Sequence, residues 1–229
     1  MNVYPDIAYI AKLIAEPTRA IILDCLLDGR SLPASQLAYH ARVSHPTMSS
    51  HLSKLVEGKL LRVEKRGRHR YYSLAGIEIA EVLEKLGTIA PPVEIRSLHQ
   101  SDKMKKICYA RTCYDHLAGE LGVKIFDSLL GLKRIERREE EYVLTPAGTK
   151  WCLQLGIQWE EGHKSRRIFL KPCLDWSERR EHMAGWFGWA IAEHCFSQKW
   201  LVKCENTRAV VVTERGKIEL QRFFHIETN

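Results

Sequence analysis

Residues 31–74 read SLPASQLAYHARVSHPTMSSHLSKLVEGKLLRVEKRGRHRYYSL, and this stretch decides the fold of the first part of the chain. Its pattern predicts a short helix over residues 33–41 and, after a tight turn, a longer helix that Ser44 or His45 caps. In residues 61–74, apolar and polar residues partly alternate on both sides of a glycine flanked by arginines. This alternation predicts a β-hairpin with a basic tip.

Further amphipathic helices are expected on either side of this stretch. Residues 7–15 place apolar side chains at helical spacing, and Pro17 ends that helix. Thr18 is a suitable cap for the next helix, and Gly29 stands where a C-terminal cap belongs. Residues 77–86 carry the same helical spacing. The first part of the chain is therefore predicted to be mainly helical, with one small hairpin.

The length of the chain allows a second domain. Of its 229 residues, 45% are hydrophobic and 28% are charged, a balance typical of folded proteins. Periodicity stops at residues 87–92, which end in two prolines, so we place a boundary there, between domains 1–90 and 93–229. No apolar run is long enough for a membrane helix, and the N-terminus, Met1 to Asp6, lacks an export signal. These features favour a cytoplasmic protein with reduced thiols.

Positive charge is concentrated in the stretch that decides the fold. The net charge is +7, and between Arg42 and Arg70 eight Lys or Arg residues stand against two Asp or Glu residues, which gives +6. Four histidines, at positions 40, 45, 51 and 69, lie in or beside this segment. Such a segment is typical of nucleic-acid binding, whereas a solvated charged face is the alternative. We therefore expect double-stranded DNA as a partner.

The helix expected after Ser44 has two contrasting faces. Met48, Leu52 and Leu55 fall on one face, and small polar residues with one lysine fall on the other. A small polar surface can approach a DNA groove closely and form hydrogen bonds with base edges or phosphates. Together with the preceding short helix and the basic hairpin, it makes a winged helix-turn-helix, in which this is the recognition helix.

The order of these motifs resembles the arsenical-resistance-repressor (ArsR) family of bacterial regulators. The residues that carry the resemblance are Leu37-Ala38, Val43-Ser44, Pro46-Thr47-Met48-Ser49, His51-Leu52, Leu55, Gly67-Arg68 and Tyr71-Tyr72-Ser73-Leu74. The resemblance covers about residues 5–90. It implies a homodimeric repressor whose two recognition helices enter successive major grooves of a palindromic operator.

The resemblance also implies where DNA is contacted. The expected contacts are Ser44, His45, Thr47, Ser49, Ser50, His51 and Lys54 on the recognition helix and Arg66, Arg68 and Arg70 on the wing. Packing or a phosphate contact is an equally good interpretation of His51, and Thr47 has the alternative role of supporting the helix start.

The sequence departs from the family pattern in three places. The turn reads Ala41-Arg42-Val43 without the usual glycine, and the glycine after the recognition helix comes one place early, at Gly58, with Lys59 following. The ligands of the known metal sites are also missing, because residues 36–40 contain no cysteine and residues 77–86 no histidine. We therefore expect any signal to be read elsewhere in the chain.

Residues 93–229 hold all six tryptophans and six of the seven cysteines, and they carry a weak internal repeat. Residues 115–122 align with 181–188 at an offset of 66, and residues 142–148 match 210–216 at an offset of 68. The pattern predicts two modules of a helix and a wing-like hairpin, with chance similarity as the alternative. The modules cover about residues 108–160 and 173–229. The expected fold class is mainly α with small β-hairpins (α+β).

An effector site is expected in this second part. Residues 111–119 and 173–180 together resemble the C-terminal domain of a two-domain subgroup of these regulators, which names no ligand. Cysteines with histidines could bind a soft metal or metalloid, a thiolate could sense oxidants, or aromatic residues with arginines could line a pocket for an aromatic or anionic small molecule. The candidates are Cys108, Cys113, His116, Cys173, Trp176, Arg179, Arg180 and His182, with Arg111, Tyr114, Trp186 and Trp189 added for the pocket.

Neither a metal site nor a cofactor is assigned from this pattern. Cys108 and Cys113 have a Cys-x4-Cys spacing that is not a recognised zinc signature, and free cysteines are usually buried small hydrophobic residues. An enzyme that uses Cys113 or Cys173 as nucleophile, with His116 or His182 as base, is a rival interpretation. Because the sequence holds no Gly-rich phosphate loop, nucleophile elbow or His-Glu-x-x-His motif, we favour a regulator and assign no catalytic residue. A constitutive architectural module without a ligand is the third interpretation.

Overall fold

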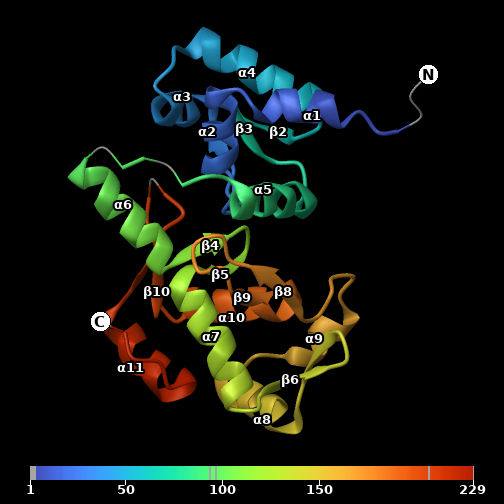
Figure 1. The fold of residues 1–229 in the computed structure, drawn as a ribbon, viewed down its shortest axis with the longest axis vertical. Helices are drawn as coiled ribbons and strands as arrows, with labels where there is room; N and C mark the ends of the chain where they lie inside the picture. Colours follow the sequence, from blue (N-terminus) through green and yellow to red (C-terminus); the bar gives the residue numbers. More distant parts are fainter. Residues whose placement is uncertain (1–3, 93, 96, 206, 229) are drawn as a thin grey trace. The chain divides into compact units, whose positions relative to one another are not determined.

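A computed structural model describes residues 4–92, 94–95, 97–205 and 207–228 of the chain (Figure 1). Two positions of the sequence interpretation, the start of the N-terminus at Met1–Val3 and the first residue of the second domain at Val93, lie outside the described residues. The chain divides into two compact units, Met1–Leu83 and Glu84–Asn229. The division thus falls inside helix α5 (Ile77–Ile89) and not at the expected prolines.

The contacts of the last turns of α5 explain this difference. Glu84 forms a buried ion pair with Arg208, and the backbone of Gly87 lies against the Trp176 side chain. The carbonyl oxygen of Thr88 accepts a hydrogen bond from Arg179. Residues from Glu84 onward therefore pack as part of the second unit.

The first unit holds the elements of a winged helix-turn-helix. They are α1 (Ile7–Ile14), α2 (Pro17–Cys25), β1 (Leu32–Pro33), α3 (Ala34–Ala41), α4 (His45–Glu57), β2 (Leu61–Arg66), β3 (His69–Leu74) and the first half of α5. The three strands form one antiparallel sheet in the order β1-β3-β2. The predicted fold of this part is confirmed.

Local chemistry explains where these helices begin and end. Ser44 caps α4 as predicted, but Thr18 does not cap α2, because Pro17 already occupies the first helical position and Glu16 accepts the cap hydrogen bond. Arg42 ends α3 in the left-handed conformation, with φ 54°, and Lys59 follows α4 with φ 57°. These are the places where the family pattern has glycine, so this chain forms the same turns with long side chains.

The core of the first unit forms from the apolar faces that the sequence predicts. Met48, Leu52 and Leu55 of α4 are buried, with exposures of 0%, 1% and 0%. Helix α4 contacts both α3 and α2, whose Leu37 and Ile22 are fully buried as well. The opposite face of α4 is therefore left to solvent.

The second unit contains α6 (Leu98–Tyr109) and then the same order of elements twice. The first half is β4 (Arg111–Cys113), β5 (His116–Ala118), α7 (Gly119–Gly131), β6 (Ile135–Arg138), β7 (Glu141–Leu144) and α8 (Pro146–Leu155). After α9 (Trp159–Lys164), the second half is β8 (Lys171–Leu174), β9 (Glu181–Ala184), α10 (Gly185–Ser197), β10 (Leu201–Lys203), β11 (Val210–Val212) and α11 (Glu214–Phe224). Each strand pair is a two-stranded antiparallel hairpin, so the mainly helical fold class with small hairpins is confirmed.

Matched residues hold equivalent places in the two halves. Thr145 and Thr213 cap α8 and α11 in the same way, each accepting a hydrogen bond from a glycine N–H three residues later, at 3.0 and 2.9 Å. Gly119 and Gly185 begin α7 and α10 with φ of 78° and 81°, a conformation that disfavours other residues. These features agree with the predicted repeat, although the duplication itself stays a prediction. None of the described helices is long and apolar enough to cross a membrane.

Candidate functional site

The first candidate site is the exposed face of α4. His45, Ser49, Ser50 and Lys54 are exposed there, as the interface with DNA requires. Two other expected contacts have structural roles as well, because the hydroxyl of Ser44 accepts from the Thr47 N–H at 3.3 Å and lies 2.8 Å from the Thr47 hydroxyl. These two side chains fix the start of the recognition helix.

The side chain of His51 lies near a protein carboxylate, that of Glu16. His51 is half-buried, and its Nδ1 lies 3.2 Å from Oε2 of Glu16 at the start of α2, without the alignment of a hydrogen bond. His51 thus ties α4 to α2, which favours the packing interpretation of this residue over a base contact.

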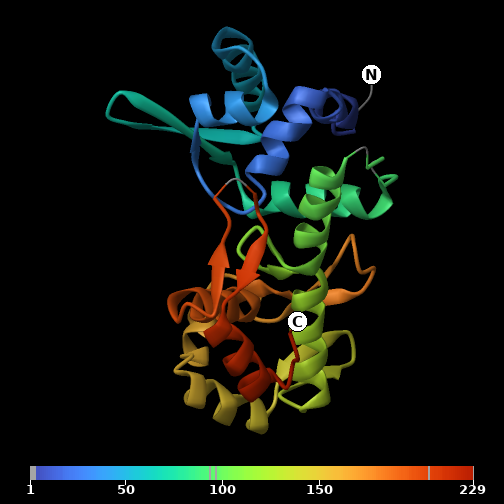
Figure 2. The ribbon, with the colours of Figure 1, turned by 90° about the vertical axis from the view of Figure 1, so that its left-hand side faces the viewer.

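The second element of this site is the wing, β2–β3. Figure 2 shows the hairpin extending away from the helices of its own unit. Arg66, Arg68 and Arg70 are all exposed. Arg66 pairs with Glu64 at 2.8 Å, whereas neither Arg68 nor Arg70 forms an ion pair with any described residue. The wing therefore presents at least two cations that are available to phosphates.

The second candidate site is a cluster of four potential metal ligands in the second unit. Cys113 and His116 stand opposite each other in β4–β5, and Cys173 and His182 stand opposite each other in β8–β9. We call these residues the four-donor cluster, because one ligand atom from each lies within 4.8 Å of the others. The Nε2 atoms of the two histidines are 3.2 Å apart. Cys173 is half-buried and the other three residues are buried.

Hydrogen bonds among the members of the cluster shift their pKa values in opposite directions. The hydrogen bond from the Cys113 thiol and those from the two imidazoles lower the pKa of Cys173, and the bond to Cys173 together with burial raises the pKa of Cys113. Burial opposes the charged form of His116, but its hydrogen bonds to Asp115 and Cys173 outweigh this effect and raise its pKa to about 9. One thiolate is therefore stabilised beside the two rings.

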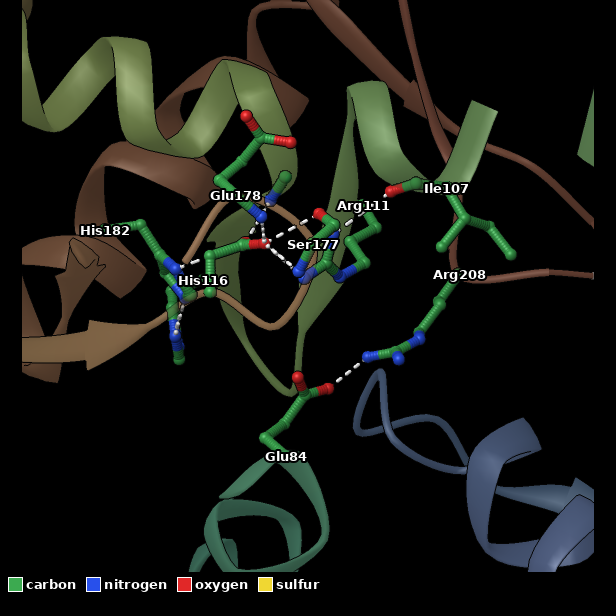
Figure 3. Close-up of polar contacts among 10 residues, drawn as sticks. Glu84, Ile107, Arg111, His116, Ser177, Glu178, His182 and Arg208 are labelled. Carbon is green, nitrogen blue, oxygen red and sulfur yellow. Dashed lines mark hydrogen bonds and ion pairs between the residues drawn. The ribbon is translucent and has the colours of Figure 1, made fainter. Parts of the chain in front are cut away.

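A buried carboxylate, Asp175, lies 3.4 Å from Nδ1 of His182, and Figure 3 shows its neighbours His182, Arg111 and Ser177. One oxygen accepts from Arg111 at 2.9 Å and from Ser177 and Glu178, and the other accepts from the Gly119 N–H at 2.6 Å. Arg111 and Asp175 are both fully buried, at 0% exposure. Burial acts against ionisation, but the attraction of Arg111 and these hydrogen bonds lower the pKa of Asp175.

Comparisons with known proteins assign the chain to a family. A helix-turn-helix domain model matches residues 14–64. The HTH-type transcriptional regulator YdfF of Bacillus subtilis is 42% identical over 223 residues, which cover 97% of this chain and 99% of that protein. The arsenical resistance operon repressor of Staphylococcus aureus is 31% identical over 86 residues, covering 38% of this chain and 82% of that protein. This chain belongs to the ArsR family of winged helix-turn-helix transcriptional regulators.

Part of the regulator is also similar to solved structures. The crystal structure of NolR from Sinorhizobium fredii covers 41% of the regulator and 100% of that chain, with 25% identity and a TM-score of 0.35. The NMR structure of the cadmium metal-sensor CMTR from Mycobacterium tuberculosis covers 40% of the regulator and 94% of that chain, with 32% identity and a TM-score of 0.33.

Other residues expected at the effector site lie outside the four-donor cluster. Cys108 is half-buried and supplies none of the four ligands. The guanidinium carbon of Arg111 lies 4.4 Å from the centre of the Trp176 ring. Arg180 forms an ion pair with Asp127 at 2.8 Å on the surface. Arg179 donates a hydrogen bond to the carbonyl oxygen of Thr88 in α5. These four residues therefore do not converge on one ligand.

Two of the aromatic residues expected to line a pocket, Trp186 and Trp189, pack in or against the core instead. Trp186 is 7% exposed and contacts Phe169 and Trp189. A pocket of about 730 Å³ does occur in the second unit, but its aromatic lining comes from Tyr142, Trp159 and Phe169. Trp186 and Trp189 therefore contribute to packing, a role that composition alone does not distinguish from binding.

Sequence reasoning missed the acidic residues that hold the histidines. Nδ1 of His116 lies 3.4 Å from Asp115, which Arg167 holds at 2.8 Å, and Nδ1 of His182 lies 3.4 Å from Asp175. Asp115 directly precedes His116, and this adjacency was the available signal. The role of Asp175 had no such signal, because it stands seven positions before His182.

Proposed function

We propose that the regulator binds operator DNA as a homodimer and represses transcription until its second unit receives a signal. One observation carries the DNA-binding part: an exposed polar face of α4, formed by a helix whose other face is buried, stands beside a wing with available arginines. The similarity to a protein named as an arsenical resistance operon repressor supports repression over activation. Since its target is DNA, we place the protein in the cytoplasm.

Exposed apolar residues of the first unit support the homodimer. In α1 only Leu13 is buried, although Ile7, Tyr9 and Ile10 are apolar or aromatic. Ile7 is 75% exposed and Tyr4, just before the helix, is 78% exposed. A helix of this composition gains stability when a second apolar surface covers it. We infer that a second copy of the chain provides that surface.

The test begins with operator selection from a random duplex library, followed by fluorescence anisotropy with the selected duplex and a scrambled one. Arg68→Ala removes a phosphate contact, so binding to both duplexes should weaken and the slope of log K against log salt should fall by about 1. Ser50→Ala removes a base-facing hydroxyl, so it should alter the preference among duplexes. Arg138→Ala is the matched control, because Arg138 is an exposed arginine on the β6–β7 hairpin of the second unit.

Two results would contradict the proposal. One is equal losses for Arg68→Ala and Arg138→Ala, which would leave the wing without a role. The other is a wild-type protein that binds the selected and scrambled duplexes alike at every salt concentration.

The rival functions make different predictions. A cysteine-dependent enzyme requires a sulfur that substrate can reach. Cys113 is only 3% exposed and Cys173 is half-buried, and because the sequence also holds no catalytic motif, we favour a regulator without catalysis. A thiol-based sensor remains the alternative for the signal, because Cys113 and Cys173 are close enough to interact. In a constitutive architectural module, replacing Cys113 or Trp176 by alanine would change stability and leave operator affinity unaffected.

A further inference from the structure

We propose that the four-donor cluster (Cys113, His116, Cys173 and His182) binds one divalent ion of the zinc class in tetrahedral geometry and so joins the β4–β5 and β8–β9 hairpins. The chain positions of these residues match neither of the metal sites that the sequence analysis considered in the first unit. The proposal concerns the second unit alone and does not depend on DNA binding.

The spacing of the donors fits such an ion. Zinc–sulfur distances of about 2.3 Å and zinc–nitrogen distances of about 2.0–2.1 Å place tetrahedral ligands about 3.3–3.8 Å apart. The two histidine Nε2 atoms are 3.2 Å apart, and all four donor atoms lie within 4.8 Å of one another. Small rotations of the side chains, on the order of 1 Å, therefore suffice to complete the site.

The outward nitrogen of each ring lies near a carboxylate, as is usual for metal-bound histidines. Nδ1 of His116 and the Asp115 carboxylate are within hydrogen-bond geometry at 3.4 Å, and Nδ1 of His182 lies 3.4 Å from the Asp175 carboxylate without the alignment of a hydrogen bond. A carboxylate in this position orients the ring and directs the lone pair of Nε2 toward the metal. Two histidines from different hairpins thus have the same orientation, with Nε2 toward the centre.

The charges around the cluster also balance for a divalent ion. Two thiolates neutralise the ion, while Arg167 neutralises Asp115 and Arg111 neutralises Asp175. Burial of an ion is tolerated when its charge is compensated in this way. Four protein ligands leave no open position for water or substrate, which is typical of a structural metal site.

Two glycines place the helices against the cluster before any ion binds. A Cβ atom on Gly122 of α7 would lie 3.6 Å from Cβ of His182, and one on Gly188 of α10 would lie 3.4 Å from Cβ of His116. Each histidine is therefore backed by the helix that follows the opposite hairpin. This reciprocal packing positions the Cβ atoms of both histidines, so that binding requires only rotation of the side chains.

The test uses the full chain, reduced with a phosphine and freed of metal by a chelator, and titrates it with Co(II). We expect saturation at one ion per chain, with the intense visible bands of tetrahedral cobalt and a thiolate charge-transfer band, and displacement of both by Zn(II). The bands should be lost in Cys173→Ser and in His116→Asn. Cys108→Ser is the matched control and should keep them, since Cys108 lies outside the cluster.

A second readout does not depend on the variants folding. All six tryptophans lie in the second unit, so their fluorescence reports its unfolding. An ion that binds only the folded state must raise the urea midpoint of the wild-type protein as its concentration rises. The proposal is wrong if Co(II) gives no saturable bands, if the spectrum is octahedral, or if Cys173→Ser binds as the wild type does. It is also wrong if Zn(II) leaves the midpoint unchanged, and a Cys113–Cys173 disulfide in protein isolated without reductant would then favour the thiol-sensor alternative.

Discussion

Replacement of Asp175 by asparagine tests whether the buried ion pair organises the second unit. Arg111 and Asp175 are fully buried and 2.9 Å apart, and the second oxygen of Asp175 accepts from the Gly119 N–H. Asparagine leaves the Arg111 charge unpaired, and in either orientation its NH2 group faces a donor. Breaking a buried pair in this way costs about 3–5 kcal/mol. With a urea m-value of about 2 kcal/mol/M, the midpoint should fall by about 2 M.

Tryptophan fluorescence during urea unfolding is the assay, because it isolates the second unit of a chain with two units. Chelator is present throughout, so that the effect on the ion pair is separated from any effect on a bound metal. The control is Asp127→Asn, which removes the partner of Arg180 from a pair whose side chains are 42% and 61% exposed. That pair is worth about 0–1 kcal/mol. If both variants shift the midpoint equally, the buried network does not have the role that we assign to it.

Three further predictions concern packing, capping and association. Gly122→Ala should destabilise the second unit by about 1–3 kcal/mol in urea unfolding, because its Cβ would lie 2.6 Å from the Leu117 carbonyl oxygen, whereas Gly131→Ala in the same helix meets open space and should be neutral or stabilising. Ser44→Ala should lose about 0.5–2 kcal/mol of local stability, measured as faster amide exchange in the first turn of α4, and unchanged exchange would refute the capping role. Ile7→Lys should lower the dimer fraction in sedimentation, and Leu153→Lys, at a 69% exposed position of α8, should not.

Sequence patterns determined much of the first unit because its contacts are local. The spacing of Met48, Leu52 and Leu55 predicted the buried face of α4, and Ser44 was identified as its cap. The basic hairpin was also predicted correctly, since alternation and a turn glycine act over a few residues. The predicted start of α2 was wrong, because Pro17 is the first helical residue and Glu16, not Thr18, accepts the capping hydrogen bond.

Only the tertiary structure decided what the second unit brings together. Cys113 and Cys173 are 60 residues apart and His116 and His182 are 66 residues apart, so no short motif joins them. The cluster exists because two separate hairpins pack against each other's helices, with Gly122 and Gly188 allowing the close approach. Residue types along the chain indicated which groups have useful chemistry. Their convergence depends on distances across the core, which sequence spacing does not encode.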